Sequence, residues 1–198
     1  MRVLLSAVGT RGDVQPVIAL AQAACELGRG VRDPLRQCPI RTYGIAGSTS
    51  HALIGAARAV GRRAIVSRGW ADLDLIDREP DCIAIGDVDH HTLFPRVAAV
   101  VHHGGAGTTV TAAGAGVPQV IVQMFSDQPF WASRVHELGL GTSIPFTELT
   151  SERLASALHA AGSAAIAEEA ALLVSRIVVD GAAVAARSLA ADVSLPLA

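Results

Sequence analysis

The stretch HHGGAGTTVTAAGAGVPQ, residues 102–119, decides the fold, and it lies between two apolar runs. RVAAVV (96–101) before it and VIVQM (120–124) after it both have the pattern of a buried strand. Residues 106–116 are mostly small and numerous enough for about three turns of helix. The glycines therefore fall where a strand runs into a helix, and the unpaired backbone N–H groups of such a junction attract anions.

Composition excludes several classes of protein. The chain has 198 residues, is 51% hydrophobic, and carries a formal net charge of −2 with its basic residues scattered, which argues against a nucleic-acid-binding surface. All 16 basic residues are Arg, so a P-loop NTPase is excluded because its phosphate-binding Lys cannot be supplied. Cys25, Cys38 and Cys82 lack metal-type spacing, which indicates buried reduced thiols. No uncharged stretch is long enough to cross a membrane, and we expect a cytoplasmic protein.

Strands and helices are predicted to alternate along the chain. A first strand at 2–8 precedes a helix at 14–27, and an irregular stretch at 28–39 has no clear period. From residue 40 we expect strands at 40–46, 63–67, 82–85, 97–102, 119–123 and 141–144, a Gly47-Ser48 turn, and helices at 50–61, 106–116, 127–138 and within 151–192. This alternation predicts an α/β fold in which helices flank a parallel sheet.

The glycine-rich junction is the first candidate site. Gly105 and Gly107 would let a phosphate approach the backbone, Thr108 and Thr109 would add hydroxyl donors, and His103 would add a ring nitrogen. The alternative is that the glycines serve strand–helix packing and the threonines cap a helix.

The second candidate site is FSDQPFW (125–131), which follows the next strand at the carboxyl edge of the sheet, where open α/β folds bind ligands. Asp127 and Gln128 could hydrogen-bond adjacent sugar hydroxyls, although Asp127 could equally cap the following helix, and both roles can hold at once. Asp13, which follows the first strand, is a candidate general base with the same capping alternative.

Two other kinds of site match the sequence less well. Gly105 and Gly107 begin a dinucleotide-binding fingerprint, but Val110 stands at its third glycine position. His102 and His103 are neighbours on a strand and point to opposite faces, so they cannot easily chelate one metal ion. No carboxylate or Cys stands at ligand spacing from them.

Three motifs, HHGGAGTT, AGVPQ and DQPFWASRV, resemble in order and spacing the donor-binding domain of GT-B nucleotide-sugar glycosyltransferases. The likeness is greatest to the bacterial family-1 enzymes that glycosylate glycopeptide antibiotics, sterols and mycobacterial lipids, and the opening MRVLLSAVGTRGDVQP is similar to the start of those enzymes. The resemblance implies a Rossmann-like domain that transfers a hexose from a UDP- or dTDP-sugar to a hydroxyl of a lipid, sterol or natural product.

The resemblance also implies roles for individual residues. Asp13 matches a proposed catalytic base, and His103 is expected to meet the phosphates of the donor. The positions that match donor-binding residues are Ser48, Trp70, Gly105, Gly107, Thr108, Thr109, Asp127 and Gln128. The family needs no metal ion and no other cofactor, because the helix N-terminus and His103 would stabilise the departing diphosphate.

Family members are about double this length, in line with two domains of ordinary size. We expect a remnant of the acceptor domain at 1–31, a junction at 32–39, and a nucleotide-sugar-binding domain with C-terminal helices at 40–198. Most of the acceptor domain is then missing, so the chain is expected to be truncated.

Several alternatives to a working transferase stay open. The chain could be a non-catalytic nucleotide-sugar-binding fragment, or the donor subunit of a split enzyme whose acceptor domain is a separate chain. A dinucleotide-dependent oxidoreductase is disfavoured by Val110. The expected partners are a nucleotide-sugar donor and a small hydrophobic hydroxylated acceptor, with no nucleic acid and at most peripheral membrane contact. The acceptor, the sugar and the nucleotide base are not specified by the sequence.

Overall fold

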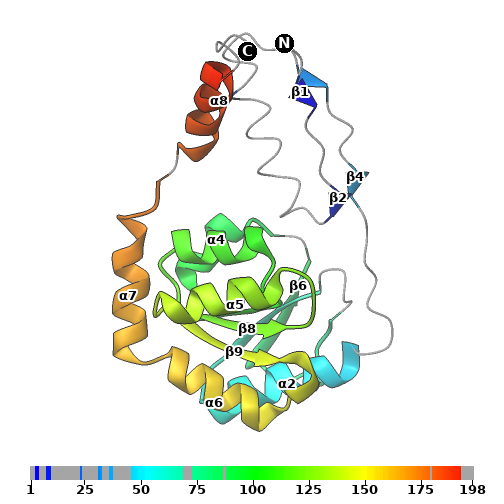
Figure 1. Ribbon diagram of the computed structural model, residues 1–198. Coiled ribbons are helices and arrows are strands. Elements are labelled where there is room, and N and C mark those ends of the chain that lie inside the picture. The colour runs from blue at the N-terminus through cyan, green and yellow to red at the C-terminus, as the bar shows by residue number, and fades with distance from the viewer. Residues whose placement is uncertain are drawn as a thin grey trace. The chain divides into compact units, whose positions relative to one another are not determined.

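The computed structural model describes residues 46–68, 73–86, 88–178 and 180–192, with short pieces at 3–4, 8–9, 23, 31–32 and 36–37 (Figure 1). The chain divides into two compact units, one of residues 40–176 and the other of residues 1–39 with 177–198. All the described candidate site residues belong to the unit of residues 40–176.

Parallel strands form the centre of the larger unit. β7 (Val100–His102), β8 (Gln119–Gln123) and β9 (Gly141–Pro145) make a three-stranded sheet with β8 in the middle. β5 (Ala64–Ser67) and β6 (Cys82–Ile85) form a separate parallel pair. The bounds of β6 and β8 are those predicted from the sequence, because both segments are short apolar runs between turn residues.

Helices connect these strands. The helices of the larger unit are α2 (Ala46–Ala59), α3 (His90–Leu93), η1 (Phe94–Arg96), α4 (Ala106–Gly114), α5 (Gln128–Glu137), η2 (Phe146–Glu148), α6 (Ser151–Ala161) and α7 (Ala164–Val174). Side-chain caps define where the last two begin, since Thr150 accepts from the N–H of Arg153 and Ser163 accepts from the N–H of Ile166.

The buried side chains of β8 alternate between two layers. Val120 and Val122 pack in a cluster with Leu154 of α6 and with α2, whereas Ile121 packs in another with Val135 of α5 and with α7. Figure 1 shows α4 and α5 on the side of the sheet away from α2 and α6. This arrangement confirms the predicted α/β fold, a parallel sheet flanked by helices on both faces.

Several predicted boundaries differ from the structure, and three of the differences have a clear physical reason. α2 begins at Ala46, so Gly47 and Ser48 lie in the first turn of a helix and not in a separate turn. β7 begins at Val100, because Val97 still closes the preceding helical turn with its N–H bonded to Phe94. α4 ends at Gly114, before Gly116 turns the backbone to a φ of +67°.

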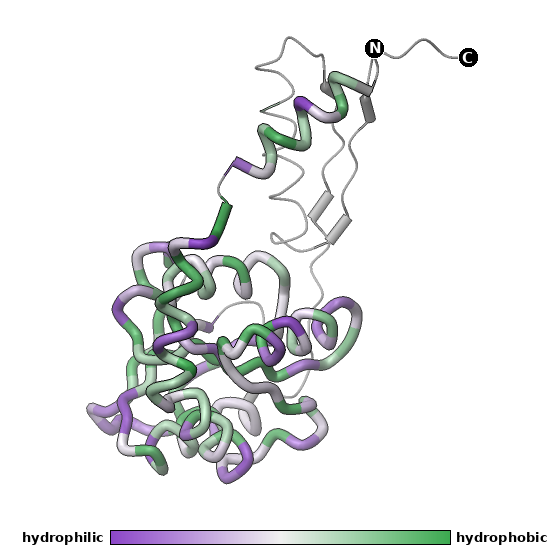
Figure 2. The backbone as a smooth tube through the Cα atoms, turned by 60° about the vertical axis from the view of Figure 1, so that its left-hand side comes forward, coloured by the Kyte–Doolittle hydropathy of each residue, from purple (hydrophilic) through white to green (hydrophobic). Residues whose placement is uncertain are grey.

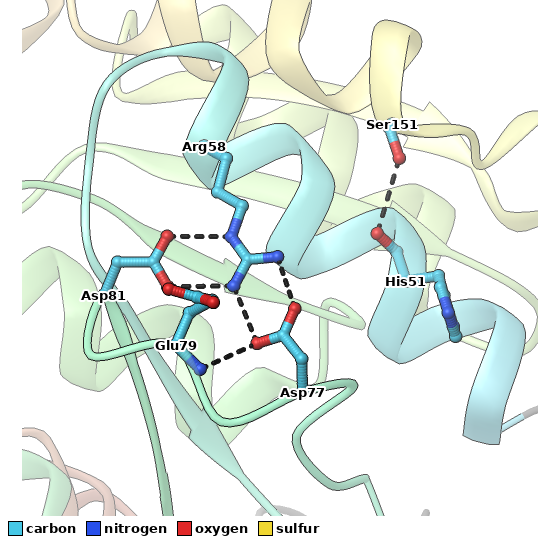
Figure 3. Close-up of polar contacts among 6 residues, drawn as sticks. All are labelled: His51, Arg58, Asp77, Glu79, Asp81 and Ser151. Carbon is cyan, nitrogen blue, oxygen red and sulfur yellow. Dashed lines mark hydrogen bonds and ion pairs between the residues drawn. The ribbon is translucent and has the colours of Figure 1, made fainter.

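An ion-pair cluster fastens the segment before β6 to α2 (Figure 3). Arg58 of α2 donates through Nε and Nη2 to Asp81 at 2.7 and 2.9 Å, and through Nη1 and Nη2 to Asp77 at 2.7 and 2.9 Å. The N–H of Glu79 also donates to Asp77. The bonds from Arg58, followed by the bond from Glu79, lower the pKa of Asp77 to about 2.

The described residues of the other unit include two short parallel strand pairs and α8. β1 (Val3–Leu4) pairs with β3 (Val31–Arg32), and β2 (Val8–Gly9) pairs with β4 (Arg36–Gln37). The stretch 28–39 was expected to lack regular structure, but it contributes β3 and β4, which are too short to show a hydrophobic period. Along α8 (Gly181–Asp192), hydrophobic and hydrophilic stretches alternate (Figure 2).

In the described part of the chain, no single helix is long and apolar enough to cross a membrane. α6 and α7 meet the criteria of length and composition only together, with a bend of 62° between them.

Candidate functional site

Two strand-to-helix junctions meet at one edge of the sheet. β7 and β8 are adjacent and parallel, so α4 and α5, which follow them, both begin at the carboxyl edge. The two junctions are in contact, because a Cβ placed on Gly104 would lie 3.4 Å from both the Cβ and the carbonyl oxygen of Gln128. The structure therefore brings the two candidate sites of the sequence analysis together.

The first junction is built from glycines. Gly104 has a φ of +91°, and a Cβ there would lie 2.7 Å from the side chain of Ile121, so only glycine fits. Gly105 is the N-cap of α4 and provides no side-chain cap, and the first turn carries no acidic residue. The first N–H groups of α4 thus lack a capping side chain, and the helix dipole favours an anion beside them.

His103 lies beside this helix start. A Cβ on Gly105 would come within 2.6 Å of His103 Nε2, so the glycine makes room for the imidazole ring. His103 itself is exposed. The ring nitrogen is thus close to the N-terminus of α4, on an exposed residue.

The two threonines of the first turn have different environments. Thr109 is only 4% exposed, and its hydroxyl donates to the carbonyl oxygen of Gly105 at 3.0 Å. Thr108 is partly exposed, as is Gly107, and its hydroxyl makes no hydrogen bond within the described residues. Thr109 therefore braces the junction from inside, while Thr108 keeps its hydroxyl available at the surface.

The second junction presents side chains that are held by other groups. The carboxylate of Asp127 is exposed and accepts a hydrogen bond from the indole N–H of Trp131 at 2.9 Å. It makes no capping hydrogen bond to α5, although Asp127 stands at the N-cap position. Trp131 packs against the core cluster that contains Ile121 and Val135. The tryptophan thus fixes one oxygen of the carboxylate.

Gln128 fixes the loop itself. It is buried, and its side-chain oxygen accepts from the backbone N–H groups of Met124 at 2.7 Å and Phe125 at 3.2 Å. Ser126 in the same loop has a φ of +63°, which is uncommon for a residue other than glycine. Such a conformation costs free energy and persists only where surrounding contacts impose it.

A polar pair beneath the first junction, half-buried His102 and buried Gln119, was not assigned a role from the sequence. His102 Nε2 lies 2.9 Å from Oε1 of Gln119, and the N–H of Gly104 donates to His102 Nδ1 at 3.1 Å. Trp131 was likewise missed. For the pair of His102 and Gln119, a signal was available in the sequence: Gln119 is a polar residue at the start of a strand whose next three residues are fully apolar.

The remaining predicted residues are less informative. Ser48 is exposed in the first turn of α2. Asp13 and Trp70 lie outside the described residues, as do nearly all of the helix at 14–27 and residues 40–45 of the strand expected at 40–46, whose last residue, Ala46, begins α2 instead. Within the described part of the chain, no group of three His, Cys, Asp or Glu side chains is arranged to hold a metal ion.

A parallel sheet with a glycine-rich strand–helix junction and a second polar junction beside it forms an α/β domain, and its solved structural neighbours are GT-B glycosyltransferases. The chain belongs to the family of the erythromycin biosynthesis protein CIII-like C-terminal domain, whose model matches residues 51–184. The match contains both junctions.

Relatives of the chain are named glycosyltransferases. Vancomycin aglycone glucosyltransferase of Amycolatopsis orientalis is 49% identical over 155 residues, which are 77% of this chain and 38% of that protein. A sterol 3-beta-glucosyltransferase of Arabidopsis thaliana is 46% identical over 101 residues, 50% of this chain and 16% of that protein. The chain thus spans well under half the length of these relatives.

Two solved structures have a similar fold. The glycosyltransferase of kitacinnamycin superposes with a TM-score of 0.63 at 22% identity, over 77% of this chain and 40% of that one. LpCGTa in complex with UDP superposes with a TM-score of 0.61 at 19% identity, over 77% of this chain and 39% of that one. These likenesses support the fold.

Proposed function

We propose that the chain binds a UDP- or dTDP-hexose at the two junctions and serves transfer of the hexose to a hydroxyl of a lipid, sterol or natural-product acceptor. The observation that carries this proposal is the contact between an uncapped glycine junction and a junction with a fixed carboxylate. The relatives named as glucosyltransferases support the same reaction class.

The first junction would hold the diphosphate. Backbone N–H groups from Gly105 to Thr108, the Thr108 hydroxyl and His103 would donate to its oxygens, and Thr109 would keep the turn in place. The same donors would stabilise the negative charge that grows on the leaving diphosphate. We therefore propose binding without a metal ion.

The second junction would hold the hexose. An ionised carboxylate only accepts hydrogen bonds, so the free oxygen of Asp127 suits a sugar hydroxyl and not a phosphate. Gln128 contributes by fixing the loop, and its amide would also reach the sugar. In the transfer, the bond from the anomeric carbon to the phosphate oxygen breaks and a bond to the acceptor oxygen forms. The acceptor proton passes to a base, for which Asp13 stays the prediction.

A second candidate function is binding of the donor alone, because both junctions lie within the unit of residues 40–176. Transfer needs an acceptor as well, and its positioning can account for about 7–11 kcal/mol of a barrier. A chain that binds the donor without placing an acceptor would act as a nucleotide-sugar-binding fragment, or as the donor subunit of a split enzyme. The cytoplasmic location also stays a prediction.

Calorimetry with UDP and dTDP tests the donor site. Thr108→Ala should weaken binding about tenfold, because a hydrogen bond to a charged group is lost. Thr108→Ser should bind like the unmodified chain. Thr111→Ala in the same helix serves as the matched control and should leave affinity unchanged. Unchanged affinity in Thr108→Ala, or binding that requires magnesium, would contradict the proposal.

A further inference from the structure

Beneath the glycine junction, one side chain links the backbone of the turn to the neighbouring strand. His102, the last residue of β7, accepts the N–H of Gly104 at Nδ1 and lies 2.9 Å from Gln119 of β8 through Nε2. Gly104 directly precedes Gly105, the N-cap of α4. The pair of His102 and Gln119 therefore holds the residue from which the proposed diphosphate turn begins.

The tautomer of the His102 ring follows from the backbone N–H of Gly104, which bonds to it. A backbone N–H can only donate, so His102 Nδ1 must be unprotonated, and the ring proton lies on Nε2. Nε2–H then donates to Oε1 of Gln119, which sets the orientation of the amide as well. Burial, which the Gln119 bond partly opposes, lowers the pKa of His102 to about 4, and the nearby His103 and His90 contribute in the same direction as burial. The ring is therefore neutral near pH 7.

Packing alone does not account for Gln119. The residue is fully buried at the start of a strand whose next residues are Val120 and Ile121, and its Nε2 has no hydrogen-bond partner in the described part of the chain. A buried amide donor without a partner reduces stability, whereas an apolar side chain of similar size would not. The presence of glutamine at this position thus indicates that its side-chain oxygen has a role, and this oxygen accepts the hydrogen bond from His102.

We propose that His102, oriented by Gln119, is a positioning residue that holds Gly104 in its left-handed conformation and so sets the diphosphate turn. This inference rests on the proposed donor-binding function. His102 acts through the backbone of the turn, whereas the exposed His103 would contact the ligand.

Two substitutions separate the two bonds of the ring. In His102→Asn, the side-chain oxygen takes a place close to that of Nδ1 and can still accept from Gly104. In His102→Gln, the longer amide reaches toward Gln119 but leaves the N–H of Gly104 without an acceptor. We expect His102→Asn to bind UDP within about twofold of the unmodified chain and His102→Gln to bind about tenfold more weakly.

Calorimetry with UDP, thermal unfolding and NMR of the full ¹⁵N-labelled chain provide the readouts. The imidazole spectrum should show the Nε2–H tautomer, and the Gly104 amide should shift in His102→Gln but not in His102→Asn. Equal affinities of the two variants, affinity losses that only follow the melting temperature, or an Nδ1–H tautomer would overturn the positioning role. If the unmodified chain fails to bind UDP, the proposed function fails, and the tautomer with the Gly104 shift still decides whether His102 holds the turn.

Discussion

The junction between β7 and α4 and the junction between β8 and α5 have the same place in the fold but present different chemistry. Both lie at the carboxyl edge of adjacent parallel strands. The first offers main-chain donors, with Gly105 as an N-cap that has no side-chain bond. The second offers side chains, with Asp127 held by Trp131 and Gln128 bonded to the loop.

In the proposed function, this difference would separate the two halves of a nucleotide sugar. A diphosphate needs several donors and no nearby carboxylate, which a glycine turn at a helix N-terminus provides. Neutral hydroxyls need acceptors with a fixed direction, which Asp127 provides because Trp131 already occupies one of its oxygens. Two adjacent strand-to-helix junctions can thus suit different ligand groups, a phosphate and a sugar hydroxyl, when one exposes backbone N–H groups and the other exposes side-chain acceptors.

The largest effect is expected from Gly104→Ala. The new Cβ would meet Ile121 at 2.7 Å in a backbone conformation with a φ of +91°. We expect a loss of about 2–4 kcal/mol in the free energy of unfolding, together with loss of UDP binding. Urea unfolding and calorimetry measure the two effects.

The matched control is Gly114→Ala at the end of α4, where a Cβ would meet no atom within 4 Å. This change should stabilise the chain by about 0.5–1 kcal/mol and leave UDP affinity unchanged. If Gly104→Ala behaved in the same way, the first junction would not depend on its backbone conformation.

A smaller and more selective effect is expected at the second junction. Asp127→Asn should weaken binding of an intact UDP-hexose about tenfold but leave UDP affinity unchanged, because only the hexose half of the ligand meets the carboxylate. Trp131→Phe keeps an aromatic ring in the core cluster and removes the N–H that holds Asp127, so a smaller loss in the same direction should follow. Equal losses for UDP and UDP-hexose would show that the two junctions do not divide the ligand.

The strands and the glycine junction could be predicted from the sequence because they depend on a local pattern of residues. The strands at 82–85 and 119–123 are bounded by turn residues, and the glycine junction combines two strong signals, an apolar strand and a run of small residues. The family resemblance rested on these junctions, and the family match confirms it.

What the sequence did not predict depends on contacts between segments that are distant in the chain. The bond between His102 and Gln119 crosses from β7 to β8, so no local period reveals it. The different exposure of Thr108 and Thr109 could not be predicted for a similar reason, because only the packing of α4 decides which of the two hydroxyls is buried. The bonding of Asp127 to Trp131 was hidden because a capping role looked equally good from the sequence.

The smallest effect on ligand binding is expected from Arg58→Gln, whose ion pairs lie at the amino end of β6 and belong to neither junction. UDP and UDP-hexose affinities should stay unchanged, and the melting temperature near pH 7 should fall by only about 2–4 °C, because exposed ion pairs contribute little. The pH dependence identifies the cause. The folded-state pKa of Asp77 is lowered from its ordinary value of 3.8 to about 2. Stability from this pair is therefore present above about pH 4 and is lost as the pH falls through about 2.

The difference in melting temperature between the unmodified chain and Arg58→Gln should be constant from about pH 5 to 8 and narrow between about pH 4 and 2. A difference that stayed constant to the acid limit would mean that Arg58 stabilises the fold through its alkyl chain, and a change in either affinity would mean that binding follows stability and not the chemistry of the two junctions.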